Sequence, residues 1–361
     1  GLTVTFDCMG NIFVRRKGAR DDLPPILMGS HLDTVPTGGK FDGPLGVLAA
    51  LEVVRTLNDA GVVTEAPLEV VNWTNEEGSR FSPYTLGSLA FAGKVELDFA
   101  LSRQDPEGIT VDRALQAIGY AGEAPVGGRE IGAYFELHIE QGPVLEASGD
   151  EIGIVTGSFL ARYYVVTVAG FAAHVGPTPM AGRKDALVGA ARVILEVHRI
   201  GNAYGADARS NAPYLEIFPH VRGVIPSEVK VSCDLRHPDR DTLLAMEREL
   251  EAAIERLRAE LGMGIAMQRY FEFGPIAFTP AMIDLIRETA TDRGYKQRDV
   301  LTIAGHDAVP MLDLCPAGMI FVPSRGGLSH NAAEWSEPGH VAAGANVLLH
   351  AVLAKAGVAT G

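Results

Sequence analysis

The sequence is poor in cysteine. Its 361 residues include only Cys8, Cys233 and Cys315, an odd number at wide spacings. This argues against a disulfide framework and against a cysteine-based zinc site, and it favours a reducing, cytoplasmic compartment. The first residues lack the basic start and apolar stretch of a secretory signal. Because the chain starts at Gly1 and not at Met, the sequence leaves open whether a targeting segment precedes it.

Long apolar runs and excess positive charge are also missing. No run approaches the roughly 20 apolar residues that a membrane-spanning helix needs, so we expect no membrane partner. The formal net charge is −14, and long-range repulsion therefore disfavours nucleic acids and anionic membranes as partners. A small anionic substrate stays compatible with this charge, because a pair of metal ions would set the local field in its site.

The length suits two domains, each with its own apolar core. In the first part of the chain, apolar runs typical of buried strands alternate with amphipathic helices, which indicates an α/β domain. A helix is expected from about Gly46, with Gly61 as its carboxyl-terminal cap. Four predicted strands deliver His or Glu just past their carboxyl ends, where open α/β sheets place their ligands. These strands lie in residues 24–33, 67–73, 133–142 and 318–324.

Between about Phe159 and Phe273 the pattern changes to shorter alternating strands and two long helices. The predicted order is β-α-β-β-α-β, which is that of a ferredoxin-like module. We therefore predict a domain over residues 159–273 that is inserted into an α/β domain formed by residues 1–158 and 274–361. Its strands are expected in residues 161–170, 214–219, 228–236 and 264–273, and its helices in residues 184–200 and 241–261.

The segment GSHLDTVPTGGKFDG places His31, Asp33 and Asp42 at one strand end and in the loop after it. Because Asp33 lies two residues from His31, both side chains leave the strand on the same face. The Asp33 carboxylate could then accept the second imidazole N–H and orient the ring for a metal ion. Asp42 has two oxygens that could bridge two cations. Taken alone, this pattern also fits a structural or surface role.

Two adjacent glutamates, Glu76 and Glu77, directly follow the apolar run LEVVNW. Their backbone is anchored at the end of a sheet, which makes them a poor choice for simple solvation. One carboxylate can ligate a metal ion while the other takes a proton from bound water and delivers it to a leaving nitrogen. An isolated pair of this kind is more often an acidic turn.

The segments ELHIEQG and GGLSHNAAE add His138 and His330. A single His after a strand is more often a structural residue than a ligand. Together with His31, however, three such residues join Asp42 and Glu77, and their joint occurrence indicates a metal site. Five nitrogen and oxygen ligands suit Zn, Mn, Co or Ni, and the absence of cysteine ligands argues against a closed structural zinc site.

At this point the chain resembles the hydantoinase/carbamoylase family of metal-dependent amidohydrolases, which contains allantoate amidohydrolase and N-carbamoyl-L-amino-acid hydrolase. The family is related more distantly to di-metal aminoacylases and carboxypeptidases. The resemblance covers nearly the whole chain. Besides the motifs above it includes GSLAFAG, GIVTG, AAHVGPTPMAGRKDA, VIPSEV, DLRHPD, AGHDA and MIFVPSRGGLSHNAAEW.

The resemblance implies a di-metal catalytic domain with a mixed central sheet flanked by helices, and an inserted ferredoxin-like lid and dimerisation domain. It implies two divalent metal ions per subunit, with Mn or Zn expected before Co or Ni. By the same resemblance His31 and Glu77 are terminal ligands on different metals, Asp42 bridges the metals, and His138 and His330 add one ligand each.

The same resemblance makes Glu76 the general acid and base. Asp33, from its position beside His31, is also expected among the catalytic residues. Gln141, Arg236 and Gly327 are expected to contact substrate. His174 falls on a lid position that reaches the active site of a neighbouring subunit in these relatives, so we expect a homodimer. His306, in AGHDA, is expected to support the site and not to ligate a metal.

One position departs from the family pattern. Relatives commonly carry Asn thirteen residues before the substrate-binding Arg, and this chain has Gly223 there. Glycine cannot donate the side-chain amide hydrogen bond that helps hold a substrate carboxylate. Arg236 keeps a planar fork that can grip a carboxylate through two hydrogen bonds. The ureido end of the substrate is therefore better defined than the rest of it.

The predicted function is hydrolysis of a C–N bond in the ureido group of a small carboxylate substrate, such as an N-carbamoyl-L-amino acid or allantoate. The predicted mechanism uses metal-bound hydroxide with Glu76 as the general base. Two alternatives stay open. One is an aminoacylase or dipeptidase that acts on an ordinary amide with the same metals, and the other is a non-catalytic protein that retains the fold.

Overall fold

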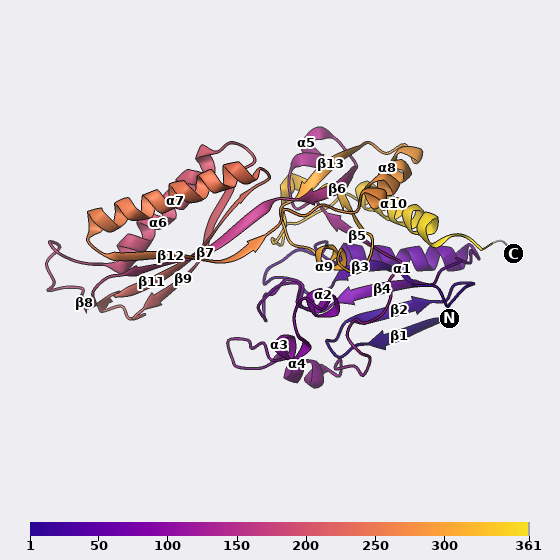
Figure 1. The fold of residues 1–361 in the computed structure, drawn as a ribbon, viewed down its shortest axis with the longest axis horizontal. Coiled ribbons are helices and arrows are strands. Elements are labelled where there is room, and N and C mark those ends of the chain that lie inside the picture. Colours follow the sequence, from indigo (N-terminus) through magenta and orange to yellow (C-terminus); the bar gives the residue numbers. More distant parts are fainter. Residues whose placement is uncertain (360–361) are drawn as a thin grey trace. The chain divides into compact units, whose positions relative to one another are not determined.

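The structure, a computed structural model, describes residues 1–359. It divides into two compact units, each of which is described by itself. Unit 1 comprises Gly1–Thr156 with Ala277–Gly361, and unit 2 comprises Gly157–Ile276. The chain of unit 2 is thus inserted into that of unit 1, and Figure 1 shows the helices and strands of both units.

Unit 1 contains an eight-stranded sheet of order β1-β2-β4-β3-β5-β14-β6-β13. The neighbours of β3 and the pair β5 and β14 are parallel, whereas β1, β2 and β6 pair antiparallel, so the sheet is mixed as predicted. The strands are Leu2–Phe6 (β1), Ile12–Arg16 (β2), Ile26–His31 (β3), Leu68–Trp73 (β4), Ala133–Ile139 (β5), Ile152–Ser158 (β6), Gln297–Thr302 (β13) and Ala317–Val322 (β14).

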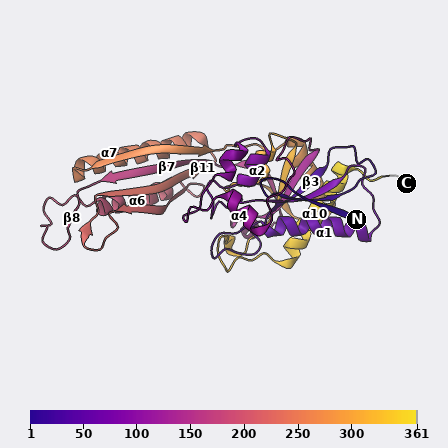
Figure 2. The ribbon, with the colours of Figure 1, turned by 90° about the horizontal axis from the view of Figure 1, so that it is seen from below.

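Helices cover both faces of this sheet, which explains why β3, β5 and β14 read as continuous apolar runs. Along β5, Phe135 and Leu137 belong to the core under one set of helices, and Tyr134 belongs to the core on the opposite face. The first set is α1 (Pro44–Asp59), α8 (Pro280–Asp292) and α10 (Pro338–Ala356), and α1 and α10 lie side by side (Figure 2). The second set includes α2 (Leu86–Phe91) and α9 (Ala308–Met311).

Short helices complete unit 1. They are α3 (Leu97–Leu101), α4 (Val111–Ile118), α5 (Val144–Ser148) and the 3-10 turn η1 (Arg325–Gly327). The helix expected from Gly46 begins two residues earlier, at Pro44, because proline is well suited to the first position of a helix. None of the helices in the described part of the chain has both the length and the apolar character needed to cross a membrane.

Unit 2 consists of a four-stranded antiparallel sheet of order β12-β7-β11-β9 and two helices. In chain order the elements are β7 (Leu160–Ala169), α6 (Ala186–Ala203), β9 (Arg209–Phe218), β11 (Glu228–His237), α7 (Arg240–Leu261) and β12 (Gly264–Phe273). The helices contact each other and cover one face of the sheet (Figure 1). A two-stranded ribbon of β8 (Ala173–His174) and β10 (Val224–Ile225) is an addition that we did not predict.

Strand β9 is also longer than predicted. The sequence pattern places its start at Tyr214, but the strand begins at Arg209, because Ser210 and Asn211 continue the pairing with β11 past an irregularity in the register. Alternation of apolar and polar side chains does not indicate such a shift. Because most side chains of β9 are exposed, the sequence pattern does not reveal where this strand begins.

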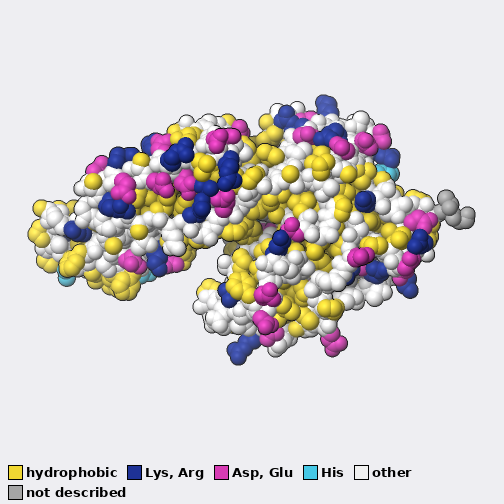
Figure 3. All heavy atoms as spheres, viewed as in Figure 1, with side chains coloured by type: hydrophobic (Ala, Val, Ile, Leu, Met, Phe, Trp, Pro, Cys, Tyr) yellow, Lys and Arg dark blue, Asp and Glu magenta, His cyan; other side chains and the backbone are white. Residues whose placement is uncertain are grey.

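Charges of both signs cover α6 and α7. Figure 3 shows Lys and Arg beside Asp and Glu over α7. Arg199 on α6 pairs with Glu249 on α7 at 2.8 Å, and Arg256 on α7 pairs with Glu196 on α6 at 3.4 Å. Each such exposed pair contributes up to about 1 kcal/mol, so the apolar contact beneath them is the larger source of cohesion.

The packing of α1 on the sheet generates a test. A methyl group at Gly46 would lie 2.5 Å from the carbonyl oxygen of Leu137 and 2.8 Å from Cβ of Ser30. Gly46→Ala should therefore destabilise the protein by about 1–3 kcal/mol through overpacking, although alanine is the better helix former. Gly339→Ala on α10 is the matched control, because nothing lies within 4 Å of an added Cβ there. Denaturant unfolding curves of both variants decide this prediction, and equal effects would contradict it.

Candidate metal centre

The parallel strands of unit 1 bring the predicted site residues to one edge of the sheet. His31 is the last residue of β3, and His138 lies one residue before the end of β5. Glu76 and Glu77 follow β4, which runs parallel to β3. Because carboxyl ends of parallel strands meet at the same edge, residues far apart in the chain become neighbours there.

The five predicted metal ligands form two groups that share Asp42. His31, Asp42 and His138 offer ligand atoms within 4.8 Å of one another, and so do Asp42, Glu77 and His330. Asp42 Oδ1 lies 3.1 Å from Nε2 of His138 and 3.7 Å from Nε2 of His31. Asp42 Oδ2 lies 3.4 Å from Nε2 of His330. Each oxygen of this carboxylate therefore faces a different group.

The histidines are oriented for metal binding by backbone carbonyls. Nδ1 of His31 lies 2.8 Å from the carbonyl oxygen of Asp33, and Nδ1 of His138 lies 2.9 Å from that of Ile139. A carbonyl oxygen only accepts hydrogen bonds, so the proton of each ring is on Nδ1. This leaves Nε2 of both rings, the atom that faces Asp42, available to a cation.

The charges and unpaired atoms of this cluster fit a pair of divalent cations. Burial opposes ionisation of Asp42, but the imidazoles of His138 and His330 outweigh it and hold its pKa well below the usual range. Conversely, burial would lower the pKa of His138, yet Asp42 raises it to about 9. Asp42 and Glu77 raise the pKa of His330 to about 10. Oε1 of Glu77 is buried without a hydrogen-bond partner. The cluster thus favours positive charge, which metal ions would supply in place of protons.

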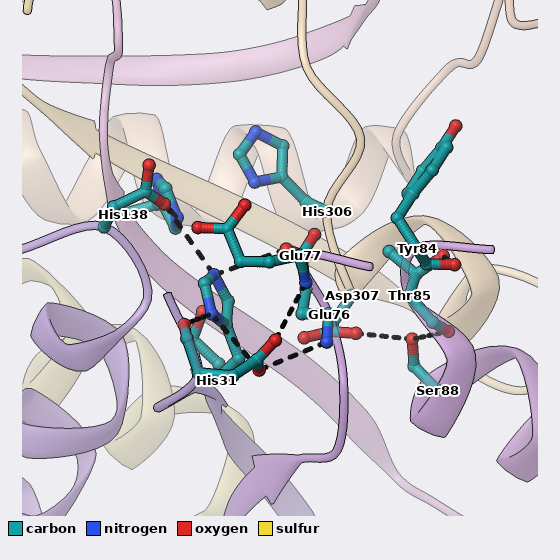
Figure 4. Close-up of polar contacts among 12 residues, drawn as sticks. His31, Glu76, Glu77, Tyr84, Thr85, Ser88, His138, His306 and Asp307 are labelled. Carbon is teal, nitrogen blue, oxygen red and sulfur yellow. Dashed lines mark hydrogen bonds and ion pairs between the residues drawn. The ribbon is translucent and has the colours of Figure 1, made fainter. Parts of the chain in front are cut away.

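Glu76 differs from its neighbour Glu77. It belongs to neither group of candidate ligands, although its Oε2 lies 3.5 Å from Nε2 of His31. Burial, and then the charge of Asp307, raise the pKa of Glu76 well above its usual value. Figure 4 shows the imidazoles of His31, His138 and His306 gathered beside the two glutamates. A buried carboxyl group with a raised pKa is suited to proton transfer.

We predicted that the Asp33 carboxylate accepts a hydrogen bond from the imidazole of His31, and this prediction is wrong. The carboxylate oxygen lies 3.7 Å from the His31 ring, too far for a hydrogen bond. It accepts instead the backbone N–H groups of Glu76 and Glu77, at 3.2 and 3.0 Å. Strand β3 ends at His31, so the side-chain alternation that predicted the contact does not continue to Asp33. Asp33 therefore holds the backbone that carries both glutamates.

Two buried carboxyl groups behind the candidate metal ligands were missed in the sequence. Glu136 accepts hydrogen bonds from Ser30 Oγ at 2.7 Å and from the N–H of Ala308 at 2.8 Å. Asp307 accepts a short hydrogen bond of 2.5 Å from Ser88, drawn in Figure 4. An acidic residue inside an apolar strand was a signal for Glu136, because it shares a face of β5 with His138.

His306 is buried behind His138, and the two ring centroids lie 4.6 Å apart. It forms a third candidate metal group with Glu136 and His138. The oxygens of Glu136 already accept hydrogen bonds, however, and Nε2 of His306 contacts Thr302 Oγ1 at 2.9 Å. His306 therefore packs against the candidate ligand His138. Because the oxygens of Glu136 and Nε2 of His306 already have partners, this group is better suited to supporting His138 than to binding a metal ion.

The predicted substrate contacts lie in both units. In unit 1, Gln141 donates from Nε2 to Asp42 Oδ2 at 2.7 Å, and its buried Oε1 has no hydrogen-bond partner. Gly327 has a positive φ of 66° and packs so closely that an added Cβ would lie 2.8 Å from the nitrogen of Pro143. Gln141 thus touches a candidate metal ligand and keeps one acceptor free.

In unit 2, His174 is the last residue of the ribbon strand β8, and its ring accepts the N–H of Gly176 at 3.1 Å. Gly223 directly precedes β10, the other strand of the ribbon, and its carbonyl accepts the N–H of Val175. Arg236 on β11 pairs with Asp234 at 2.7 Å and lies over the ring of Tyr163. Space beside Gly223 is open, because nothing lies within 4 Å of an added Cβ.

Comparisons with known proteins agree with this geometry. The model of peptidase family M20/M25/M40 matches residues 27–354. An N-carbamoyl-L-amino-acid amidohydrolase of Rhizobium meliloti is 42% identical over 99% of this chain and 86% of its own length. An allantoate amidohydrolase of Bacillus subtilis is 34% identical over 96% of this chain and 85% of its own length.

A solved structure extends the likeness to the fold. An amidase of the hydantoinase/carbamoylase family from Burkholderia vietnamiensis superposes with a TM-score of 0.92. It is 48% identical, and the match covers 99% of this chain and 86% of that one. The resemblance drawn from the sequence motifs is confirmed: the chain belongs to peptidase family M20/M25/M40, and within it to the hydantoinase/carbamoylase type of amidohydrolase.

Proposed function

We propose that this protein is a two-metal amidohydrolase that cleaves a C–N bond in the ureido group of a small carboxylate substrate, such as an N-carbamoyl-L-amino acid or allantoate. The observation that carries the proposal is the pair of ligand groups that share Asp42, with the buried carboxyl group of Glu76 beside them. The names of the relatives support the ureido group and the carboxylate of the substrate. The free cysteines are compatible with a cytoplasmic enzyme.

In this proposal His31 and His138 would hold one metal ion, Glu77 and His330 would hold the other, and Asp42 would serve both. Mn or Zn fits the nitrogen and oxygen donors, with Co or Ni as alternatives. When bound, such ions polarise a substrate carbonyl and lower the pKa of water at the site. The charges of Asp42 and Glu77 only partly offset those of two dications, so the site favours an anionic substrate.

Glu76 acts as the proton carrier. Its carboxylate takes the proton of the attacking water and then delivers it to the departing nitrogen of the substrate. The position of Glu76 serves this role, because its buried carboxyl group lies beside His31, with Oε2 3.5 Å from Nε2 of that ring, and belongs to neither group of candidate ligands. Asp33 fixes the backbone that carries Glu76 and Glu77.

We further propose that unit 2 is a ferredoxin-like lid and dimerisation domain. Arg236 grips the substrate carboxylate through its planar fork, and Gly223 leaves space where relatives carry an amide side chain. Gln141 and Gly327 complete the contacts from unit 1. His174 stabilises the oxyanion of the transition state in the site of the partner subunit, so assembly into a homodimer is required for turnover.

The proposed substrate class is tested with a substrate panel. Metal-free protein is loaded with Mn²⁺, Zn²⁺, Co²⁺ or Ni²⁺ and assayed on allantoate, ureidoglycolate, N-carbamoyl-amino acids, N-acyl-amino acids and dipeptides. Hydrolysis should be fastest on ureido carboxylates and absent without metal. Preference for an N-acyl-amino acid or a dipeptide would replace the proposal by an aminoacylase or a peptidase. Metal binding without any turnover would indicate a non-catalytic protein.

The division of roles between the two glutamates gives a second test. Glu76→Gln keeps the shape of the side chain but removes the base, so turnover should fall by about 10²–10⁴ with metal content nearly intact. Glu77→Gln should instead lower metal retention. Metal analysis and turnover of both variants are compared with those of the wild type. Equal metal loss in the two variants would sink the assignment.

The dimer gives a third test, by mixing His174→Ala with Glu76→Gln and allowing subunits to exchange. If His174 acts across the interface, one site of each mixed dimer lacks both groups and the other has both. Half of all dimers are mixed at random pairing, so activity should return to about a quarter of the wild-type value. Absence of recovery in proven mixed dimers would place His174 in its own subunit's site or outside catalysis.

A further inference from the structure

A buried carboxylate that belongs to no candidate metal group joins the two loops that carry Asp42 and His330. Glu334 is 3% exposed. Its Oε1 accepts the backbone N–H of Phe41 at 2.8 Å and that of Asp42 at 3.1 Å. Glu334 is separated from these residues by more than 290 positions in the chain. It therefore ties the backbone of the Asp42 loop to the loop that follows β14.

The same loop also contacts the side chain of Asp42. Ser329 Oγ lies 2.5 Å from Asp42 Oδ2 and 3.1 Å from Oε2 of Glu334. A hydroxyl group has one proton to donate, and the shorter contact assigns that proton to Asp42. Gln141 donates a second hydrogen bond to the same oxygen, at 2.7 Å. Asp42 is thus held at its backbone by Glu334 and at its carboxylate by Ser329 and Gln141.

The position of Glu334 is itself tightly defined. Its own N–H donates to the carbonyl of Asn331 at 2.9 Å, and the Asn331 side chain accepts the N–H of Ala333 at 2.8 Å. This turn fixes Glu334 relative to His330, which has a positive φ of 53°. On the other loop, an added Cβ at Gly39 would lie 2.1 Å from Oε1 of Glu334. Glycine at this position allows the carboxylate to reach the backbone.

We propose that Glu334 is a positioning residue that fixes Asp42 and His330 in the arrangement required to bind the two metals. The inference rests on the proposed metal-dependent function. Asp42 lies in a loop whose free movement would add an entropic cost to every metal-binding event. Glu334 removes this cost by ordering the loop before metal arrives, and Ser329 separately holds the carboxylate of Asp42. Outer partners of metal ligands typically alter metal affinity by about 10–100-fold.

The test measures Mn²⁺ affinity of metal-free protein by titration calorimetry, together with hydrogen exchange of the amides of Phe41 and Asp42. Glu334→Ala should weaken binding by about 10–100-fold and speed exchange of both amides before metal is added. Glu334→Gln retains a carbonyl oxygen for the two amides and an NH₂ group for Ser329, so it should restore most of the affinity. Rescue by this variant separates hydrogen bonding from a loss of packing.

Gly39→Ala supplies an independent route to the same result, since it leaves Glu334 in the chain but displaces its carboxylate. It should weaken Mn²⁺ binding and speed exchange as Glu334→Ala does, and it decides the matter if Glu334→Ala does not fold. The matched control is Glu337→Ala, because this nearby exposed glutamate pairs with Arg325 and not with the Asp42 loop. Mn²⁺ binding and exchange should not change in the control.

The outcomes separate the two claims. Wild-type protein that binds Mn²⁺, with weakened binding in Glu334→Ala and Gly39→Ala, supports the positioning role. If both variants bind Mn²⁺ as tightly as the wild type and their amides exchange at the same rate, the positioning role is overturned. The proposed function is then unaffected. If the wild type binds neither Mn²⁺ nor Zn²⁺, the proposed function fails and the inference fails with it.

Discussion

Negative charge buried at one edge of the central sheet is the constraint on which the rest of this structure depends. Asp42, Glu76, Glu136 and Asp307 are all removed from solvent within unit 1. Isolated carboxylates in such surroundings would be neutralised by a shift of their pKa. Burial does raise the pKa of Glu76, Glu136 and Asp307, whereas Asp42 stays ionised because imidazoles face it. One cluster therefore contains both an ionised candidate metal ligand and protonatable acids.

The architecture of unit 1 holds the residues of this cluster in place. Helices on both faces exclude water from β3, β5 and β14, so the strand ends that carry His31 and His138 are fixed by a continuous apolar core. The glutamates and Asp42 come from loops, which have no such core to order them. Hydrogen bonds order them instead: Asp33 holds the backbone of the glutamates, and Glu334 holds that of Asp42. Carboxylates thus order the loops that carry other carboxylates.

Unit 2 is built on a different principle. Its core lies between one face of a four-stranded sheet and two helices, and its charged residues form surface pairs such as Arg199 with Glu249. Two residues of our proposed mechanism, His174 for the oxyanion and Arg236 for the substrate carboxylate, lie on a ribbon and on a strand of this unit. All the candidate metal ligands thus lie in unit 1, whereas the residues that we propose to contact substrate are divided between the two units.

The resemblance to the family implied the mixed sheet, whereas the sequence pattern by itself determined the α/β class and the collection of His31, His138 and Glu77 at one edge. These follow from local rules, because strand length and direction decide where a side chain after a strand must lie. Only the tertiary structure decided which atoms of Asp33 face His31 and that Glu334 contacts Asp42. Such contacts join residues far apart in the chain, and their geometry depends on loop conformation, which neither periodicity nor spacing specifies.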